Sequence, residues 1–219
     1  MLPLDLHVRI VDRAMMADFV EAAQETRFAD ALIFALLTGV RIGELRGLRW
    51  SDIDYATGRI TIERQIISGN RFAPIQTTKN GKARTFQLSQ AALELLKKHR
   101  REQQIERMAC GDKWIEDDVC AGLIFRKPNG DHYHQSTLRE AIKKVGAAIG
   151  LEGMTAHDLR HSFAVAALRS GTDVKTVQHM LGHSSAAVTM NIYMHYTDDM
   201  GKSAADRMDA YWSDALGRG

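Results

Sequence analysis

The sequence predicts an α+β domain that is mostly helical and carries a small antiparallel β-sheet. Two patterns lead to this fold class. Apolar residues recur at helical spacing over most of the 219 residues. Residues 59–88 instead contain alternating apolar and polar side chains on both sides of the pair Asn80-Gly81, which favours a two-residue hairpin. No linker divides the chain, so we expect one domain over residues 1–219.

The composition is that of a soluble globular protein, with 45% hydrophobic and 26% charged residues. A net charge of +2 does not by itself indicate a nucleic-acid partner, because the local distribution of charge matters more. No stretch approaches the roughly 20 apolar residues of a membrane span. The two cysteines, Cys110 and Cys120, are expected to be reduced thiols of a cytosolic protein.

Two helices and a short third one are expected at the start of the chain. Helical patterns cover about residues 12–26 and 28–37, and Gly39 is a natural terminator of the second. A short helix over 43–48 follows, so that Arg41 lies in the turn that enters it. An arginine in such a turn can direct its planar fork at a phosphate together with backbone N–H groups. A solvated surface arginine is the alternative.

The expected sheet has three short segments. Residues 59–67 alternate as a strand should, a second strand covers about 71–76, and residues 83–88 form the return strand of the hairpin. Lys79 lies at the hairpin tip, and Lys82 is its competitor across the same turn. Either lysine could serve a site, or both could be solvated turn charges.

The middle of the chain returns to helices. One helix is expected to begin after Ser89, the predicted N-cap, with an apolar stripe that extends to Ile105. Its basic run could contact DNA or form a solvated face. Residues 122–125 read as a short buried strand, and a helix over 136–149 follows.

The most informative stretch extends from Met154 to Tyr193. A helix over 157–170, capped by Thr155, is followed by a second helix that ends at Gly182. Four side chains of this stretch could meet around one phosphate: His157, Arg160, His183 and Tyr193.

The residue types gathered in these turns and helix ends point to phosphate chemistry without a metal. Arginines bind a phosphodiester through paired hydrogen bonds and stay charged while negative charge builds on phosphorus. Histidine and lysine can donate or accept protons near neutral pH. Flanking cations favour the phenolate form of a tyrosine, which is then a usable nucleophile. Chain order alone does not show that these side chains converge.

Five motifs in order resemble the catalytic domain of the tyrosine recombinases, the integrases of phages and conjugative transposons. They are TGVRIGEL, TTKNGKARTFQL, HDLRHSFA, LGHSS and the tyrosine after VTMNI, and the match covers nearly the whole chain. The resemblance implies no metal and no cofactor, an acidic neighbour, Glu44, and six catalytic residues: Arg41, Lys79, His157, Arg160, His183 and Tyr193.

What the resemblance implies is site-specific DNA recombination, the integration or excision of a mobile element. Tyr193 attacks a phosphodiester and forms a 3′-phosphotyrosyl link, the two arginines bind the non-bridging oxygens, and Lys79 protonates the departing 5′-oxygen. The implied partners are double-stranded DNA with attachment sites, other protomers in a synaptic tetramer, and accessory directionality or host DNA-bending proteins. The implied place is the cytoplasm of a bacterium. Because such integrases carry an N-terminal DNA-clamping domain, we expect a C-terminal fragment of a longer protein.

Several alternatives remain open on the sequence. A type IB topoisomerase shares the residues and the covalent step. His157 and His161 have metal-ligand spacing, so a metallohydrolase is a second alternative, and a non-catalytic helical DNA-binding module is a third. Tyr196 is a competing nucleophile. A last helix, about 199–216, packs on its own domain or docks onto a neighbouring molecule.

Overall fold

The computed structural model describes residues 9–67, 76–77, 83–182 and 209. The described helices are α1 (Met16–Gln24), α2 (Ala29–Thr38), α3 (Ile42–Gly47), α4 (Gln90–Cys110), α5 (Gln135–Ala148), α6 (Ala156–Arg169) and α7 (Val174–Leu181), with short 3-10 turns at Trp50–Asp52 and Gly111–Lys113. The described strands are β1 (Ile53–Asp54), β2 (Arg59–Ile62), β3 (Arg64–Gln65), β4 (Gln76–Thr77) and β5 (Arg84–Gln87). This confirms the predicted fold class.

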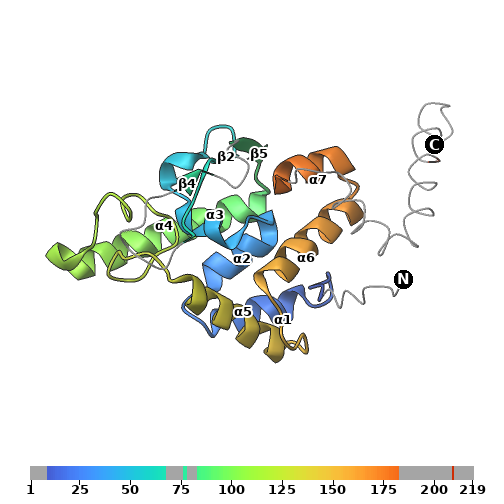
Figure 1. The fold of residues 1–219 in the computed structure, drawn as a ribbon, viewed down its shortest axis with the longest axis horizontal. Helices are drawn as coiled ribbons and strands as arrows, with labels where there is room; N and C mark the ends of the chain where they lie inside the picture. Colours follow the sequence, from blue (N-terminus) through green and yellow to red (C-terminus); the bar gives the residue numbers. More distant parts are fainter. Residues whose placement is uncertain (1–8, 68–75, 78–82, 183–208, 210–219) are drawn as a thin grey trace.

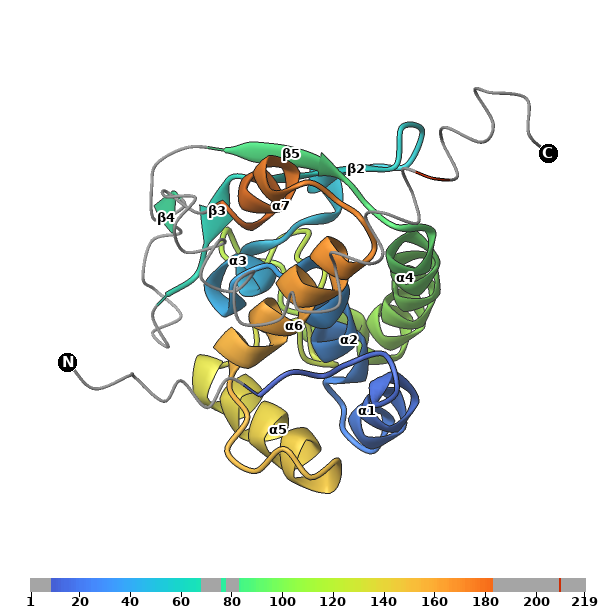
Figure 2. The same ribbon diagram turned by 90° about the vertical axis from the view of Figure 1, so that its right-hand side faces the viewer.

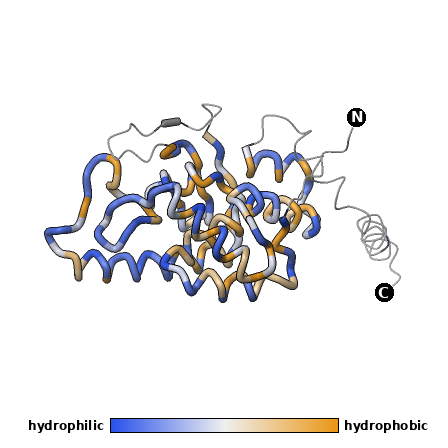
Figure 3. Tube along the Cα trace, turned by 60° about the horizontal axis from the view of Figure 1, so that its bottom comes forward, coloured by the Kyte–Doolittle hydropathy of each residue, from blue (hydrophilic) through white to orange (hydrophobic). Residues whose placement is uncertain are grey.

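Helix α2 is the centre of the helical part and packs against α1, α4 and α6 (Figure 1). Its sequence, ADALIFALLT, is apolar on nearly every side, as expected of a helix that is covered all round. Leu32 and Phe34 are fully buried, and the Phe34 ring lies 5.3 Å from that of Phe125. Hydrophobic residues are concentrated in this middle part of the chain trace, whereas hydrophilic ones dominate the outer loops (Figure 3).

The sheet divides into two pieces. Strands β1, β2 and β5 form a three-stranded antiparallel sheet, in which Ile60 pairs with Phe86 and Ile62 with Arg84. Strands β3 and β4 form a separate antiparallel pair. The predicted sheet over 59–88 therefore exists, but it begins earlier, at β1. The hairpin at Asn80-Gly81 and nearly all of the strand expected over 71–76 lie outside the described residues.

Helix α7 packs against β5 and α6, which brings α7 next to the sheet (Figure 2). Two predicted caps set the helices here. Thr155 accepts hydrogen bonds from the backbone of His157 and Asp158 and so fixes the start of α6. Gly182, with φ +62°, ends α7 in the left-handed conformation. The predicted cap Ser89 of α4 is confirmed as well.

Two expectations were wrong. Ile105 was expected to be buried in the apolar stripe of α4, but it is 62% exposed, and Gln103 is buried instead. Gln103 is buried because its side-chain amide accepts a hydrogen bond from the Trp50 indole at 2.8 Å and donates one to the Ile124 carbonyl at 2.6 Å. Residues 122–125 are mostly buried but form only an isolated bridge, Arg49 with Leu123, instead of a strand.

No helix among the described residues has both the length and the apolar character needed to cross a membrane.

Candidate functional site

Arg41 is the N-cap of α3, as its place in the turn predicts. Its backbone N–H donates to the Glu44 Oε2 at 2.9 Å and its Nη1 donates to Oε1 at 3.0 Å, so the same carboxylate fixes both ends of the residue. The Arg41 side chain is still 30% exposed. The guanidinium is therefore held in one orientation and remains open to a ligand.

Arg160 is nearly fully buried and lies between two main-chain carbonyls. Its Nη1 donates to the Gly39 oxygen at 2.8 Å, and its Nη2 donates to the Leu181 oxygen at the end of α7. Burial, and then the charge of Arg41, lower the pKa of Arg160 to about 9, so the group is still a cation at neutral pH.

Gly39 makes this approach possible. Its φ is +64°, and an added Cβ would lie 2.5 Å from the Phe163 ring and 2.6 Å from a Leu181 methyl. A larger residue would clash with both α6 and α7 while adopting a strained backbone. The turn after α2 is thus shaped to bring Arg41 and Arg160 together.

The two arginines meet at the C-terminal end of α7, although they come from distant parts of the sequence. The Arg41 Nη2 donates to the Gly182 oxygen at 3.0 Å, across a separation of 141 residues. The Leu181 oxygen next to it accepts from Arg160. Carbonyl oxygens at a helix C-terminus carry the negative end of the helix dipole, which favours nearby cations.

A cavity of about 530 Å³ lies beside the arginines, between α3, α5 and the start of α6. Its lining is strongly basic and, among the described residues, contains no Asp or Glu: Arg41, Ile42, Arg139, Lys143, Met154, Thr155, Ala156, His157 and Arg160. Such a concentration of cations in one concave surface attracts an anion, and the guanidinium groups suit a phosphate.

His157 is exposed at the first turn of α6 and lines the same cavity. The side of its ring that faces the protein is partly desolvated. This partial burial, followed by the charge of Arg160, lowers the pKa of His157, while Asp158 opposes the change. The imidazole is therefore neutral at pH 7 and has one nitrogen able to accept a proton. In this cavity it can take part in proton transfer to or from a bound group.

The His161 ring packs against the His157 ring, and the two histidines do not form a metal-binding group with a third described residue. The two rings meet edge to face with centroids 4.4 Å apart. Among the described residues, neither histidine belongs to any group of three side chains able to hold a metal ion. The histidine-based metallohydrolase therefore has no ligand set in the part of the chain that the structure describes.

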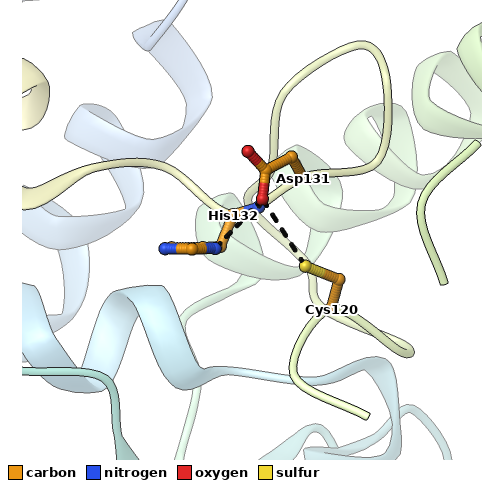
Figure 4. Close-up of side chains that lie close together, drawn as sticks. All are labelled: Cys120, Asp131 and His132. Atoms are coloured by element: carbon orange, nitrogen blue, oxygen red, sulfur yellow. Dashed lines mark hydrogen bonds and ion pairs between the residues drawn. The ribbon is translucent and has the colours of Figure 1, made fainter. Parts of the chain in front are cut away.

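Two other groups of described side chains consist of residue types that can bind a metal ion. One is Asp30, His99 and Glu102, and the other is Cys120, Asp131 and His132. In the second (Figure 4), the Cys120 thiol donates to Asp131 Oδ1 at 3.8 Å, and the other oxygen of Asp131 accepts from the Lys127 ammonium at 2.6 Å. Burial raises the pKa of the Cys120 thiol to about 11, so the thiol is protonated at neutral pH. We interpret this group as a structural hydrogen-bonded cluster.

The structure brings three predicted site residues together: Arg41, His157 and Arg160. Five predicted or competing site residues lie outside the described residues: Lys79, Lys82, His183, Tyr193 and Tyr196. The last predicted helix, about 199–216, lies outside them as well, apart from residue 209. Sequence reasoning missed two cations of the lining, Arg139 and Lys143 of α5. Their signal was a spacing of four residues, which places them on one side of a helix.

Comparison with known proteins identifies one family. A family model described as "Phage integrase family" matches residues 10–200. The chain is 31% identical over 200 residues to a "Tyrosine recombinase XerC-like" protein of Caldanaerobacter subterraneus subsp. tengcongensis, covering 86% of this chain and 51% of that protein. It is 29% identical over 190 residues to the tyrosine recombinase XerA of Pyrococcus furiosus, covering 86% of this chain and 57% of the relative.

Solved structures give the same result for the fold. A crystal structure of a XerA recombinase is similar with a TM-score of 0.66 and 26% identity, over 91% of this chain and 65% of that one. The Tn1549 transposon integrase in complex with a circular intermediate DNA has a TM-score of 0.73 over 94% of this chain and 68% of that one. At 22% identity this second likeness concerns the fold alone. The chain spans about half the length of the curated relatives that it matches.

Proposed function

Since this chain belongs to the phage integrase family, we propose that it cleaves and rejoins DNA strands in site-specific recombination through a covalent 3′-phosphotyrosyl intermediate. One observation carries the proposal: Arg41 and Arg160 meet at the end of α7, beside a basic cavity that also contains His157. Preorganised cations of this kind stabilise the charge that develops on a phosphodiester during its cleavage, and they need no reorganisation when the reaction occurs.

In the proposed reaction, the Tyr193 oxygen attacks phosphorus and the bond from phosphorus to the 5′-oxygen breaks. The phenol loses its proton, and the departing 5′-oxygen gains one from Lys79. Arg41 and Arg160 bind the two non-bridging oxygens. The 5′-hydroxyl of a partner strand then attacks the phosphotyrosyl ester and releases Tyr193, so the energy of the original bond is conserved and no ATP is required.

The histidines complete the proposed proton transfers. The lowered pKa of His157 keeps its imidazole neutral at physiological pH, which suits a group that takes a proton from the attacking phenol. His183 directly follows Gly182, whose oxygen is bound by Arg41. We assign it a hydrogen bond to the transition state.

The partners and place of action follow from the same proposal. The substrate is double-stranded DNA with attachment sites, the synaptic complex is a tetramer of protomers, and accessory directionality or host DNA-bending proteins assist. The reaction takes place in the cytoplasm of a bacterium, on the DNA of a mobile element. A Tn1549 integrase structure has been solved with circular intermediate DNA, and XerH, a further relative in fold, with its difH substrate.

The proposal can be tested by incubating the protein with a pool of nicked DNA duplexes whose central sequence is randomised. Cleavage near the nick releases a short fragment that diffuses away, so the covalent adduct accumulates. We expect an adduct whose peptide, identified by mass spectrometry, contains Tyr193. Tyr193→Phe should abolish the adduct and leave DNA binding nearly intact, and Arg41→Ala should also stop cleavage.

The neighbouring tyrosine offers the matched control, because Tyr196→Phe should leave the adduct unchanged. An adduct on Tyr196 would move the nucleophile, and DNA binding without any adduct would favour a non-catalytic module. Loss of cleavage with a chelator would favour a metal enzyme. Relaxation of supercoiled plasmid without strand exchange would favour a type IB topoisomerase.

A further inference from the structure

Three successive carbonyl oxygens at the end of α7, which we call the α7 carbonyl triplet (Met180, Leu181 and Gly182), each accept a hydrogen bond from a different arginine. Arg160 and Arg41 bind the second and third. The first accepts from the Nε of Arg84 at 2.8 Å. Arg84 lies on β5, where the pairing register sets it opposite Ile62, and its side chain is only 6% exposed.

Arg84 also binds the carboxylate that holds Arg41. Its Nη1 donates to the Glu44 Oε1 at 2.9 Å and its Nη2 to Oε2 at 2.7 Å, a paired interaction with a side chain that has no exposed surface. Burial alone would raise the pKa of Glu44, but the hydrogen bonds and charge of Arg84, and then those of Arg41, lower it. The carboxylate is therefore ionised and shared between two arginines.

These contacts place Arg84 between the two groups that hold the Arg41 guanidinium. It touches both groups that orient Arg41, namely Glu44 and the end of α7, yet it is absent from the lining of the basic cavity. Space around it is limited, because an added Cβ on Gly182 would lie 3.1 Å from the Arg84 Nη1. A lysine has a single ammonium and cannot reproduce the fork on Glu44 together with the Nε bond to Met180.

On the basis of the proposed function, we infer that Arg84 is a positioning residue for strand cleavage. It orients Arg41 through Glu44 and fixes the α7 carbonyl triplet, and it does not touch the DNA. Its guanidinium joins β5, α3 and α7 at one point. Small displacements of a phosphate-binding group reduce the rate of the chemical step strongly, whereas they change binding of a long DNA much less, because many other contacts contribute to that binding.

Arg84→Lys tests the inference. In single-turnover cleavage of a nicked duplex at saturating DNA, we expect the rate to fall about tenfold to a hundredfold. The dissociation constant for the same duplex should change by less than about threefold, since no phosphate contact is removed. Arg59→Lys is the matched control, because Arg59 is an exposed arginine on the adjacent strand β2 and should leave both quantities unchanged.

A double variant separates positioning from folding. Glu44→Gln combined with Arg84→Met removes both charges of the buried pair, so neither partner is left as an isolated buried charge. It should be closer to the unsubstituted protein in thermal stability than Arg84→Met alone, yet it should still cleave slowly.

The outcomes are distinct. Wild-type cleavage by Arg84→Lys or by the double variant, in a protein whose Tyr193 adduct is confirmed, overturns the role of Arg84 and leaves the proposed function standing. Equal losses of rate and DNA affinity also overturn it, because they indicate a general disturbance of the fold. Absence of any adduct in the unsubstituted protein overturns the proposed function and this inference with it.

Discussion

Arg46 and Arg160 are two buried arginines in different regions of the molecule, with exposures of 1% and 4%. Both donate to main-chain carbonyls. Arg46 binds the oxygens of Tyr133 at 2.8 Å and Ile66 at 2.6 Å, and Arg160 binds that of Gly39 at 2.8 Å. Burial lowers the pKa of each, to about 10 and about 9. By these measures the two side chains are nearly the same.

The difference lies in what surrounds them. Arg160 lines the basic cavity with Arg41 and His157, whereas Arg46 connects two backbone segments and is absent from that lining. A buried arginine is therefore not a sign of a functional site. The sign is convergence of several cations on an open concavity, which needs a reason beyond stability because like charges repel.

Substituting Arg160 should produce the largest effect. In Arg160→Lys, one ammonium replaces a planar fork, and we expect strand cleavage at saturating DNA to fall by about two to three orders of magnitude. Single-turnover formation of the covalent adduct measures it. Arg169→Lys, an exposed arginine on the same helix, serves as the control and should cleave normally. A loss of less than about threefold for Arg160→Lys would remove Arg160 from the site.

The matching substitution at Arg46 should affect stability instead. A lysine cannot reach both the Tyr133 and the Ile66 carbonyls, so at least one buried acceptor loses its partner, and the free energy of unfolding should fall by about 2–3 kcal/mol. Urea unfolding measures this. The folded fraction of Arg46→Lys should cleave at the normal rate. A cleavage defect as large as that of Arg160→Lys, with unchanged stability, would show that the comparison is mistaken.

Local signals in the sequence were enough to place the arginines of the site. Gly39 ends α2, Thr155 starts α6, and both effects act within a few residues, so Arg41 and Arg160 could be put in a turn and on a helix face. The resemblance to a known family also gave Glu44 as the acidic neighbour of Arg41, which the structure confirms. What the sequence could not provide was the distant partners of the two arginines. The Arg160 contact with Gly39 spans 121 residues, and no local rule reaches that far.

Arg84 shows where a closer reading could have succeeded. It occupies an inward position of an alternating strand, two residues before the buried Phe86, and a charged side chain at such a position needs a buried partner. Ile105 shows the opposite error. Its spacing fits the stripe of α4, but the loop that covers this helix binds Gln103, whose amide satisfies two backbone carbonyls and the Trp50 indole.

The buried histidine beside the site should make stability depend on pH. Burial, and then the charges of His157 and Arg160 against the opposing Asp158, lowers the pKa of His161 to about 4. The unfolded state therefore takes up this proton first as the pH falls, so stability is complete above about 6.5 and is lost between about 6.5 and 4.

Replacing that ring isolates its contribution. His161→Phe should reduce the slope of unfolding free energy against pH by at most about 1.4 kcal/mol per pH unit within this window, because one proton no longer titrates. Urea unfolding at several pH values measures the slope, and the carboxylates titrate alike in both proteins. Equal slopes would mean that the pKa of His161 is the same in the folded and unfolded states.

The smallest effect is expected at the rim of the cavity. Lys143 lines it and also pairs with the exposed Glu140 at 2.9 Å, so it is solvated and should contact a phosphate only as a point charge. Lys143→Gln should reduce the dependence of log affinity on log salt by about 0.9 and leave cleavage at saturating DNA unchanged. Lys97→Gln is the matched control, since Lys97 pairs with Glu94 at 3.0 Å in the same spacing on α4. If both variants change the salt dependence equally, the basic face of α4 binds DNA as well, and the cavity is not where the phosphate contacts are concentrated.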